Sequence, residues 1–198
     1  MAERDQGVTA GELLLAEYTA VKDEQRARIG FRDNLLYATI AAMAAAVAGA
    51  LQVDHHGAEL LLALPPVSVI LGWTYLVNDE KISAIGRYLR DDLAPRLGAL
   101  TAGPAGGESG AGADGAGADG SRVFGWESAH RGDPRRRTRK VLQLSVDLLT
   151  FCGAPVAAAA GYWSIGPVHP PLLLVSLAET AAVGVLAWQI VVYAEVRR

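Results

Sequence analysis

The sequence RRRTRKVLQLSVDLLTFCGAPVAAAAGYW, residues 135–163, decides the fold. Five of its first six residues are basic, and the 23 residues that follow, 141–163, contain neither Lys nor Arg. A helix of 23 residues rises about 35 Å, which matches the hydrocarbon core of a bilayer, ~30 Å thick. We therefore predict a transmembrane helix over 141–163 with a basic cluster at its entrance.

Three further segments have the same apolar character: 35–53, 60–77 and 172–193. The two short connections 54–59 and 164–171 contain no Lys or Arg, so all 18 basic residues lie in the remaining polar segments. Membrane proteins concentrate basic residues in their cytoplasmic loops. The sequence thus predicts an all-α integral protein of the cell membrane with four transmembrane helices and both termini in the cytoplasm.

Two alternatives to this topology stay open. The four segments would also fit buried helices of a soluble bundle, although such helices normally carry a polar stripe. The small residues near the end of 35–53 resemble a signal-peptide cleavage site. The sorting of the basic residues favours membrane spans over a soluble bundle, and the 34-residue polar lead favours an uncleaved first helix.

The first and second transmembrane helices are expected to extend into the cytoplasm. Thr9 and Glu12 have the T-x-x-E spacing of a capping box, which predicts one helix through the amphipathic segment 1–34 and on into the first span. The second span continues as a helix over 78–100, with Pro95 as the first residue able to stop it. We expect these extensions to pack antiparallel as a cytoplasmic helical stalk.

The second extension carries an apolar stripe whose members recur at three and four residues. The stripe consists of Ile82, Ile85, Leu89 and Leu93. Such spacing places the side chains on one helix face. Two interpretations remain: the stripe is buried against the first extension, or it docks a cytoplasmic partner protein.

The segments between the second and third spans differ in composition. Residues 101–121 consist mainly of Gly and Ala, which predicts a disordered linker. The string GAGADG at 110–115 matches a dinucleotide pattern, but no predicted strand precedes it, so we expect no cofactor. The basic segment 122–140 is expected to serve orientation together with general contact to anionic lipids, and the alternative is specific binding of a lipid or a nucleotide. Its basic cluster consists of Arg135, Arg136, Arg137, Arg139 and Lys140.

Two acidic residues lie inside the predicted spans, Asp147 in the third and Glu179 in the fourth. An ionisable side chain in a membrane suggests an ion or proton path, because its burial in lipid is costly. The alternative is structural pairing, which we expect for Asp147 with Arg32 or Lys140. The corresponding candidates for Glu179 are Thr74, Tyr162 and Gln189.

Several classes of protein are disfavoured. The sequence contains one Cys and no catalytic motif, so we expect neither an enzyme nor a cysteine-based metal site. A weak alternative metal or pH-sensing site is formed by Asp54, His55, His56, Glu59 and His169. The net charge of −3 disfavours nucleic acid as a partner.

The sequence therefore favours a non-enzymatic membrane module, an anchor or an effector, that forms homo-oligomers. Its cytoplasmic helices would sense or dock a partner, and its partners would include the bilayer and anionic lipids. The alternative is a small ion or proton channel or transporter that uses Asp147 and Glu179.

Overall fold

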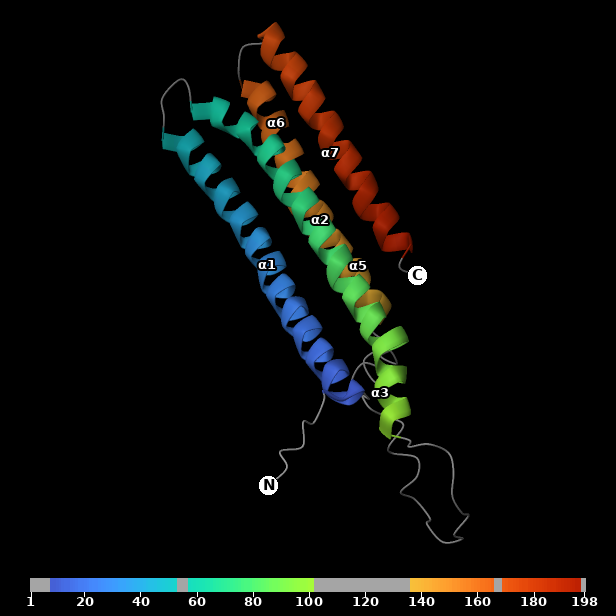
Figure 1. Ribbon diagram of the computed structural model, residues 1–198. Helices are drawn as coiled ribbons and strands as arrows, with labels where there is room; N and C mark the ends of the chain where they lie inside the picture. The colour runs from blue at the N-terminus through green and yellow to red at the C-terminus, as the bar shows by residue number, and fades with distance from the viewer. Residues whose placement is uncertain (1–7, 53–56, 102–135, 166–168, 197–198) are drawn as a thin grey trace, which may run out of the picture. The chain divides into compact units, whose positions relative to one another are not determined.

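A computed structural model describes residues 8–52, 57–101, 136–165 and 169–196 (Figure 1). Within these ranges the regular structure is helical, and no strand is present. The helices in chain order are α1 (Ala10–Gln52), η1 (Gly57–Ala63), α2 (Leu64–Tyr88), η2 (Leu89–Leu93), α3 (Ala94–Thr101), α5 (Arg136–Leu148), η4 (Leu149–Gly153), α6 (Ala154–Ile165) and α7 (Pro170–Val196). The all-helical fold is thus confirmed for these residues.

Four continuous helical stretches are long and apolar enough to cross a membrane. They are Ala10–Gln52, Glu59–Leu100, Thr138–Ser164 and Pro170–Ala194. Each contains one of the four apolar segments that the sequence indicated, except that Val53, the last residue of the first segment, lies outside the described residues. The first two stretches run for 43 and 42 residues, so the expectation that they continue well beyond a span length is confirmed.

The start of α1 is a capping box, as the sequence predicted. The Thr9 backbone N–H donates to Glu12 Oε2 at 2.8 Å, and the Glu12 backbone N–H donates to Thr9 Oγ1 at 3.2 Å. The Leu13 N–H reaches the Thr9 carbonyl at 3.1 Å. These bonds satisfy N–H groups that a helix start leaves without partners.

The second long helix continues past Pro95 to Thr101, close to the end at residue 100 that the sequence indicated. A short π-helical turn, η2, precedes this proline, and the Ala94 N–H donates to the Leu89 carbonyl five residues back. The η4 turn precedes Pro155 in the same way, with Ala154 N–H bonded to the Leu149 carbonyl. The wider turn takes the chain past the proline ring, which would otherwise clash with the carbonyl four residues back.

The described residues divide into two compact units. Unit 1 comprises 8–28 and 81–101, and its core consists of Leu14, Leu89 and Leu93. Tyr18, Val21, Ile85, Tyr88 and Leu97 pack against this core. The Tyr88 hydroxyl also donates to Glu17. Apolar burial between two helical segments thus holds unit 1 together.

The described residues of unit 2 are 29–52, 57–80, 136–165 and 169–196, and they include the described part of each of the four apolar segments. Within it, α1 and the α5–α6 stretch run in one direction, while α2 and α7 run in the other (Figure 1). Its core cluster consists of Leu35, Tyr75, Phe151, Cys152, Val183, Leu186 and Ile190. Every one of the four helical stretches contributes to this core.

Candidate functional site

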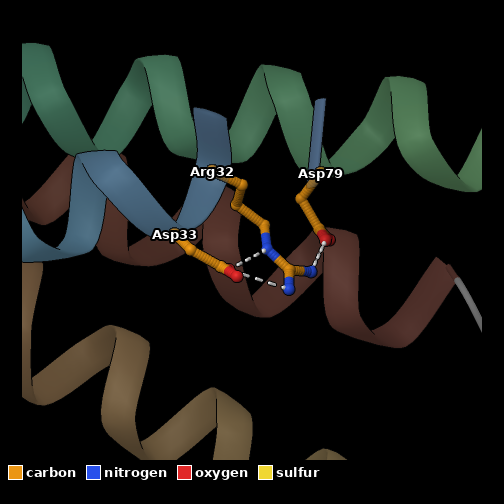
Figure 2. Close-up of polar contacts among 3 residues, drawn as sticks. All are labelled: Arg32, Asp33 and Asp79. Atoms are coloured by element: carbon orange, nitrogen blue, oxygen red, sulfur yellow. Dashed lines mark hydrogen bonds and ion pairs between the residues drawn. The ribbon is translucent and has the colours of Figure 1, made fainter. Parts of the chain in front are cut away.

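An ion pair joins α1 to α2 inside unit 2. Arg32 Nη1 donates to Asp79 Oδ1 at 3.1 Å, and the Arg32 Nε and Nη2 groups donate to Asp33 Oδ1 at 3.3 and 3.2 Å (Figure 2). The Asp79 side chain is only 10% exposed and that of Arg32 is 25% exposed. A pair this deeply placed is screened less by solvent than a surface pair.

A second set of polar groups lies beside this pair and comes from α2 and α5. The Tyr75 hydroxyl donates to the Asp147 carboxylate, and the Gln143 amide donates to the Tyr75 oxygen. Asp147 also interacts electrostatically with Arg32 and Asp79. Three helices thus contribute to one polar cluster, defined here as Arg32, Asp33, Tyr75, Asp79, Gln143 and Asp147.

An open-sided cavity of about 50 Å³ adjoins this polar cluster. Its polar lining comes from Tyr75, Asp79, Lys140, Gln143, Asp147 and Tyr193. One buried water needs roughly 10–15 Å³ by the same measure, so this space admits a few waters or a small ion. An organic cofactor needs a pocket several times larger, on the order of 300 Å³.

The structure changes the partners expected for Asp147. Arg32 pairs directly with Asp79 and Asp33 and acts on Asp147 through space. Lys140, the other expected partner, lines the same cavity as Asp147. The hydrogen bond to Asp147 comes from Tyr75, which the sequence did not single out. Asp147 is therefore part of the polar cluster, in which Arg32 and Tyr75 are its interacting neighbours.

Among the described residues of unit 2, the buried side-chain atoms without a hydrogen-bond partner include Ser68 Oγ, Ser176 Oγ and Glu179 Oε2. The two serines are 1% and 5% exposed. A buried polar group that is left unpaired costs about 1–3 kcal/mol. Thr74, one of the partners expected for Glu179, instead donates to the Ile70 carbonyl at 2.8 Å. These oxygens are therefore positions at which a ligand or water would find unmade hydrogen bonds.

Asp147 and Glu179 are not brought together. Ile190 lines the cavity beside Asp147, and Glu179 lies eleven residues before Ile190 on α7. At 1.5 Å per residue, the two levels differ by roughly 16 Å along the helix axis. A carboxylate pair that shares one proton needs side chains in contact, so this arrangement does not provide one. Within the described residues, no three His, Cys, Asp or Glu side chains gather as metal ligands.

The remaining predicted site residues fall in different places. In the stripe proposed for docking, Leu89 and Leu93 are 3% and 0% exposed in the core of unit 1, while Ile82 and Ile85 are partly buried. Mutual burial of the two extensions is therefore what the structure contains. In the basic cluster, Arg136 and Arg137 begin α5, Arg139 is exposed and Lys140 lines the cavity.

Other predictions fall on residues that the structure does not describe. Arg135, most of the 101–121 linker and the start of the 122–140 segment lie outside the described residues, as do Asp54, His55 and His56. The lipid contact stays a prediction.

Sequence reasoning missed Asp79, Tyr75 and the two buried serines. The buried residues of α2 include Ser68, Gly72, Tyr75 and Asp79, at intervals of four, three and four. A polar or small residue at each turn of an otherwise apolar helix is a signal that one face meets protein rather than lipid. This pattern is visible in the sequence. Because Asp79 is charged, however, the sequence assigns it to the solvated extension 78–100 and not to the span.

Comparisons with known protein families, with curated proteins and with solved structures found no match to this chain.

Proposed function

We propose that this chain is a non-enzymatic four-pass membrane module that assembles as a homo-oligomer and acts as an anchor or effector. The supporting observation is the low burial of its four apolar helices. Only 11% to 28% of the most apolar window of each helix is buried within the chain. The remaining apolar surface requires lipid or another apolar partner, since a water-exposed patch of this extent is rare.

The proposed orientation places unit 1 on the cytoplasmic side, where the basic residues are concentrated. The stripe from Ile82 to Leu93 is largely covered, so the docking surface we propose is a different one. Leu15 and Leu100 are 60% and 50% exposed. Gly11 lies one turn before Leu15, and a Cβ at Gly11 would contact Leu100 at 3.8 Å. This exposed apolar patch suits the apolar face of a partner helix.

Membrane placement is tested with single cysteines on the two proposed sides. In a Cys152→Ala background, His169→Cys is expected to react from outside intact cells with a membrane-impermeant maleimide. Ala84→Cys is expected to react only after the cells are permeabilised. The chain must also resist extraction from membranes by alkaline carbonate. Extraction, or equal labelling of the two cysteines in intact cells, would rule out the proposed topology.

Assembly and docking are tested on the full chain extracted in mild detergent. Native mass measurement is expected to give a multiple of the chain mass for the homo-oligomer. A partner bound through the patch is expected to dissociate in Leu15→Ser and in Leu100→Ser. The matched control is Arg87→Ser, an exposed change on α2. A monomer in every detergent, or a partner lost equally in the control, would contradict the proposal.

The alternative function is a small channel or transporter for ions or protons, and two observations favour it. Asp147 is buried beside a cavity of water size. Glu179 has a buried carboxylate oxygen without a partner. Ion flux into liposomes that contain the full chain tests this candidate, with Glu179→Gln and Asp147→Asn as variants. Background flux in the parent protein would exclude it.

A further inference from the structure

The cavity beside Asp147 lies where the apolar segments of the first two helices end. Arg32 precedes the first apolar segment, 35–53, and Asp79 follows the second, 60–77. Asp147 lines the cavity and interacts electrostatically with both of them. In the proposed membrane placement, this level is the cytoplasmic head-group region of the bilayer. The cavity is then within reach of lipid head groups and of small solutes from the cytoplasm.

The Asp147 carboxylate is largely withdrawn from water. The residue is 9% exposed, it accepts a hydrogen bond from the Tyr75 hydroxyl, and Arg32 acts on it through space. Arg32 is itself bonded to Asp33 and Asp79. A buried carboxylate needs donors or a positive charge to replace its lost hydration. Asp147 therefore has the capacity to accept further hydrogen bonds from a group placed in the cavity.

The charges at the cavity and its adjoining ion pair leave one negative charge in excess. The carboxylates are those of Asp33, Asp79 and Asp147, and the cations are Arg32 and Lys140. An excess negative charge favours a ligand with a single positive charge and disfavours an anion. The electrostatics of the cavity therefore indicate a monovalent cation.

The remaining walls of the cavity are apolar. They are formed by Leu76, Leu144, Ile190 and Ala194. A bare metal ion prefers a complete shell of oxygen ligands, which carbon atoms on these sides do not offer. An organic cation is different, because its methylene groups contact apolar walls while its ammonium group donates to a carboxylate. The mixed lining therefore favours a short alkylammonium over a metal ion.

The size of the cavity limits this organic cation. Its volume of about 50 Å³ is roughly three to five times what one water needs by the same measure. An aminoethyl group with its ester oxygen, O–CH₂–CH₂–NH₃⁺, has four non-hydrogen atoms of about this size. A trimethylammonium group adds three carbons and has no N–H to donate. The cavity therefore fits a primary ammonium and excludes a quaternary one.

We propose that this cavity binds the primary ammonium of an aminoethyl group. The ammonium donates to the Asp147 carboxylate, and the two methylene groups contact Leu144 and Ile190. Two sources carry this chemistry: the head group of phosphatidylethanolamine in the bilayer, and a small free amine in the cytoplasm. The lipid source rests on the membrane placement proposed above, whereas binding of a free amine does not.

The lipid source is tested by native mass measurement of the full chain in mild detergent. Phosphatidylethanolamine, phosphatidylcholine and phosphatidylglycerol with identical acyl chains are added in equal amounts. We expect adducts of phosphatidylethanolamine to exceed those of phosphatidylcholine about tenfold, because only the primary ammonium donates hydrogen bonds to the carboxylate. Phosphatidylglycerol, which is anionic and has no amine, measures attraction to the basic residues alone.

The free amine is tested by thermal unfolding of the same detergent-solubilised chain. Ethylammonium chloride is compared with tetramethylammonium chloride at equal ionic strength. A ligand that binds only the folded chain raises the midpoint of unfolding. We expect ethylammonium to raise the midpoint and tetramethylammonium to leave it unchanged.

Two variants assign the binding to this cavity. Asp147→Asn removes the charge at nearly constant size, and Ala194→Leu fills the cavity while it keeps every charge. Each is expected to abolish the preference for the primary ammonium. The matched control is Glu80→Gln, the same carboxylate-to-amide change at an exposed residue next to Asp79, and it should bind as the parent does. Circular dichroism verifies the fold of each variant, and Ala194→Leu decides the result if Asp147→Asn does not fold.

The outcomes separate the two sources and the two kinds of failure. A preference for phosphatidylethanolamine assigns the lipid as the ligand, and stabilisation by ethylammonium alone assigns the free amine. Neither effect in the parent, or an effect that persists in the folded variants, would overturn the site. Phosphatidylglycerol held as tightly as phosphatidylethanolamine would overturn the lipid source. Ethylammonium binding by a chain that alkaline carbonate extracts from membranes would instead defeat the proposed membrane function and leave the site intact.

Discussion

Arg32 and Asp79 lie 47 residues apart in the chain, yet Arg32 Nη1 and Asp79 Oδ1 are 3.1 Å apart in unit 2. This contact fixes the end of the α2 apolar segment against the start of the α1 apolar segment, directly beside Asp147. A charge pair that is mostly withdrawn from solvent depends on each partner, since either group alone would be an uncompensated charge.

Removal of one partner of this pair should destabilise unit 2. We expect Asp79→Leu to cost about 1–3 kcal/mol, less than a fully buried pair would, because Arg32 is still partly hydrated. The double variant Arg32→Met with Asp79→Leu should recover part of the loss. Denaturant unfolding of the detergent-solubilised chain measures both. The surface pair Arg26–Asp23 is the control, and an equal loss in Asp23→Leu would contradict this explanation.

Tyr75→Phe should isolate the hydrogen bond to Asp147. The substitution keeps the ring against Phe151 and removes only the hydroxyl that donates to the carboxylate. A hydrogen bond to a charged group contributes about 1.5–3 kcal/mol, and that loss in unfolding free energy is expected. Tyr37→Phe, at a tyrosine that is 66% exposed, should leave stability unchanged. Indistinguishable unfolding curves for the two variants would argue against the contact.

Gly72→Ala should be harmful although alanine favours helices. The new Cβ would meet Leu186 Cδ2 at 2.7 Å and two atoms of the Phe151 ring at 3.0 Å, and both residues are fully buried. Overpacking of this kind costs about 1–3 kcal/mol. Gly184→Ala is the control, because a Cβ there meets nothing within 4 Å. A second change, Leu186→Val, should restore stability to Gly72→Ala by making room for the Cβ.

Leu93→Ala should destabilise unit 1 selectively. Leu93 is 0% exposed and packs with Leu14 and Leu89, so its truncation leaves a cavity that costs about 2–5 kcal/mol. Leu13→Ala, at a leucine that is 60% exposed, should change stability by less than about 0.5 kcal/mol. Amide hydrogen exchange resolves the two units, and faster exchange confined to unit 2 in Leu93→Ala would refute the assignment of this core.

The capping box at the start of α1 should make the first helical turn sensitive to acid. Hydrogen bonds from the Thr9 backbone and hydroxyl lower the pKa of Glu12 in the folded chain. A lowered folded pKa means that this contribution is fully present above the unfolded pKa of Glu12 and is lost as pH falls through the folded pKa. Hydrogen exchange of the first-turn amides against pH measures the effect. Glu12→Gln should remove that pH dependence, and its persistence would exclude the mechanism.

Several parts of the fold could be predicted from the sequence because their causes are local. The apolar runs, the Thr9–Glu12 cap and the continuity of the two long helices depend on residues within a few turns of each other. Pro95, the first residue able to stop the second long helix, does not stop it. A proline prevents the bond to the carbonyl four residues back, but a π turn placed before it avoids that bond altogether.

The candidate site could be predicted only in part. The single charges Asp147 and Glu179 stand out in apolar segments, and the structure confirms that the Asp147 side chain and one Glu179 oxygen are buried. The residues around them could not be predicted from the sequence. Nothing in the sequence distinguishes Tyr75, Asp79 and Ser68 from exposed polar residues, because their burial depends on packing against a second helix. When a second helix covers a hydroxyl or a carboxylate, water is excluded, and the packing then decides whether that group has a hydrogen-bond partner.

The sequence by itself determined the helical class, the four apolar lengths and the concentration of basic residues on alternate connections. These properties follow from helix rise and side-chain polarity, which need no knowledge of neighbours. Only the tertiary structure decided that Arg32 pairs with Asp79, that Leu93 is enclosed in unit 1, and that Glu179 Oε2 has no partner. Each of these depends on the register between helices, which close packing sets through contacts such as Gly72 with Leu186.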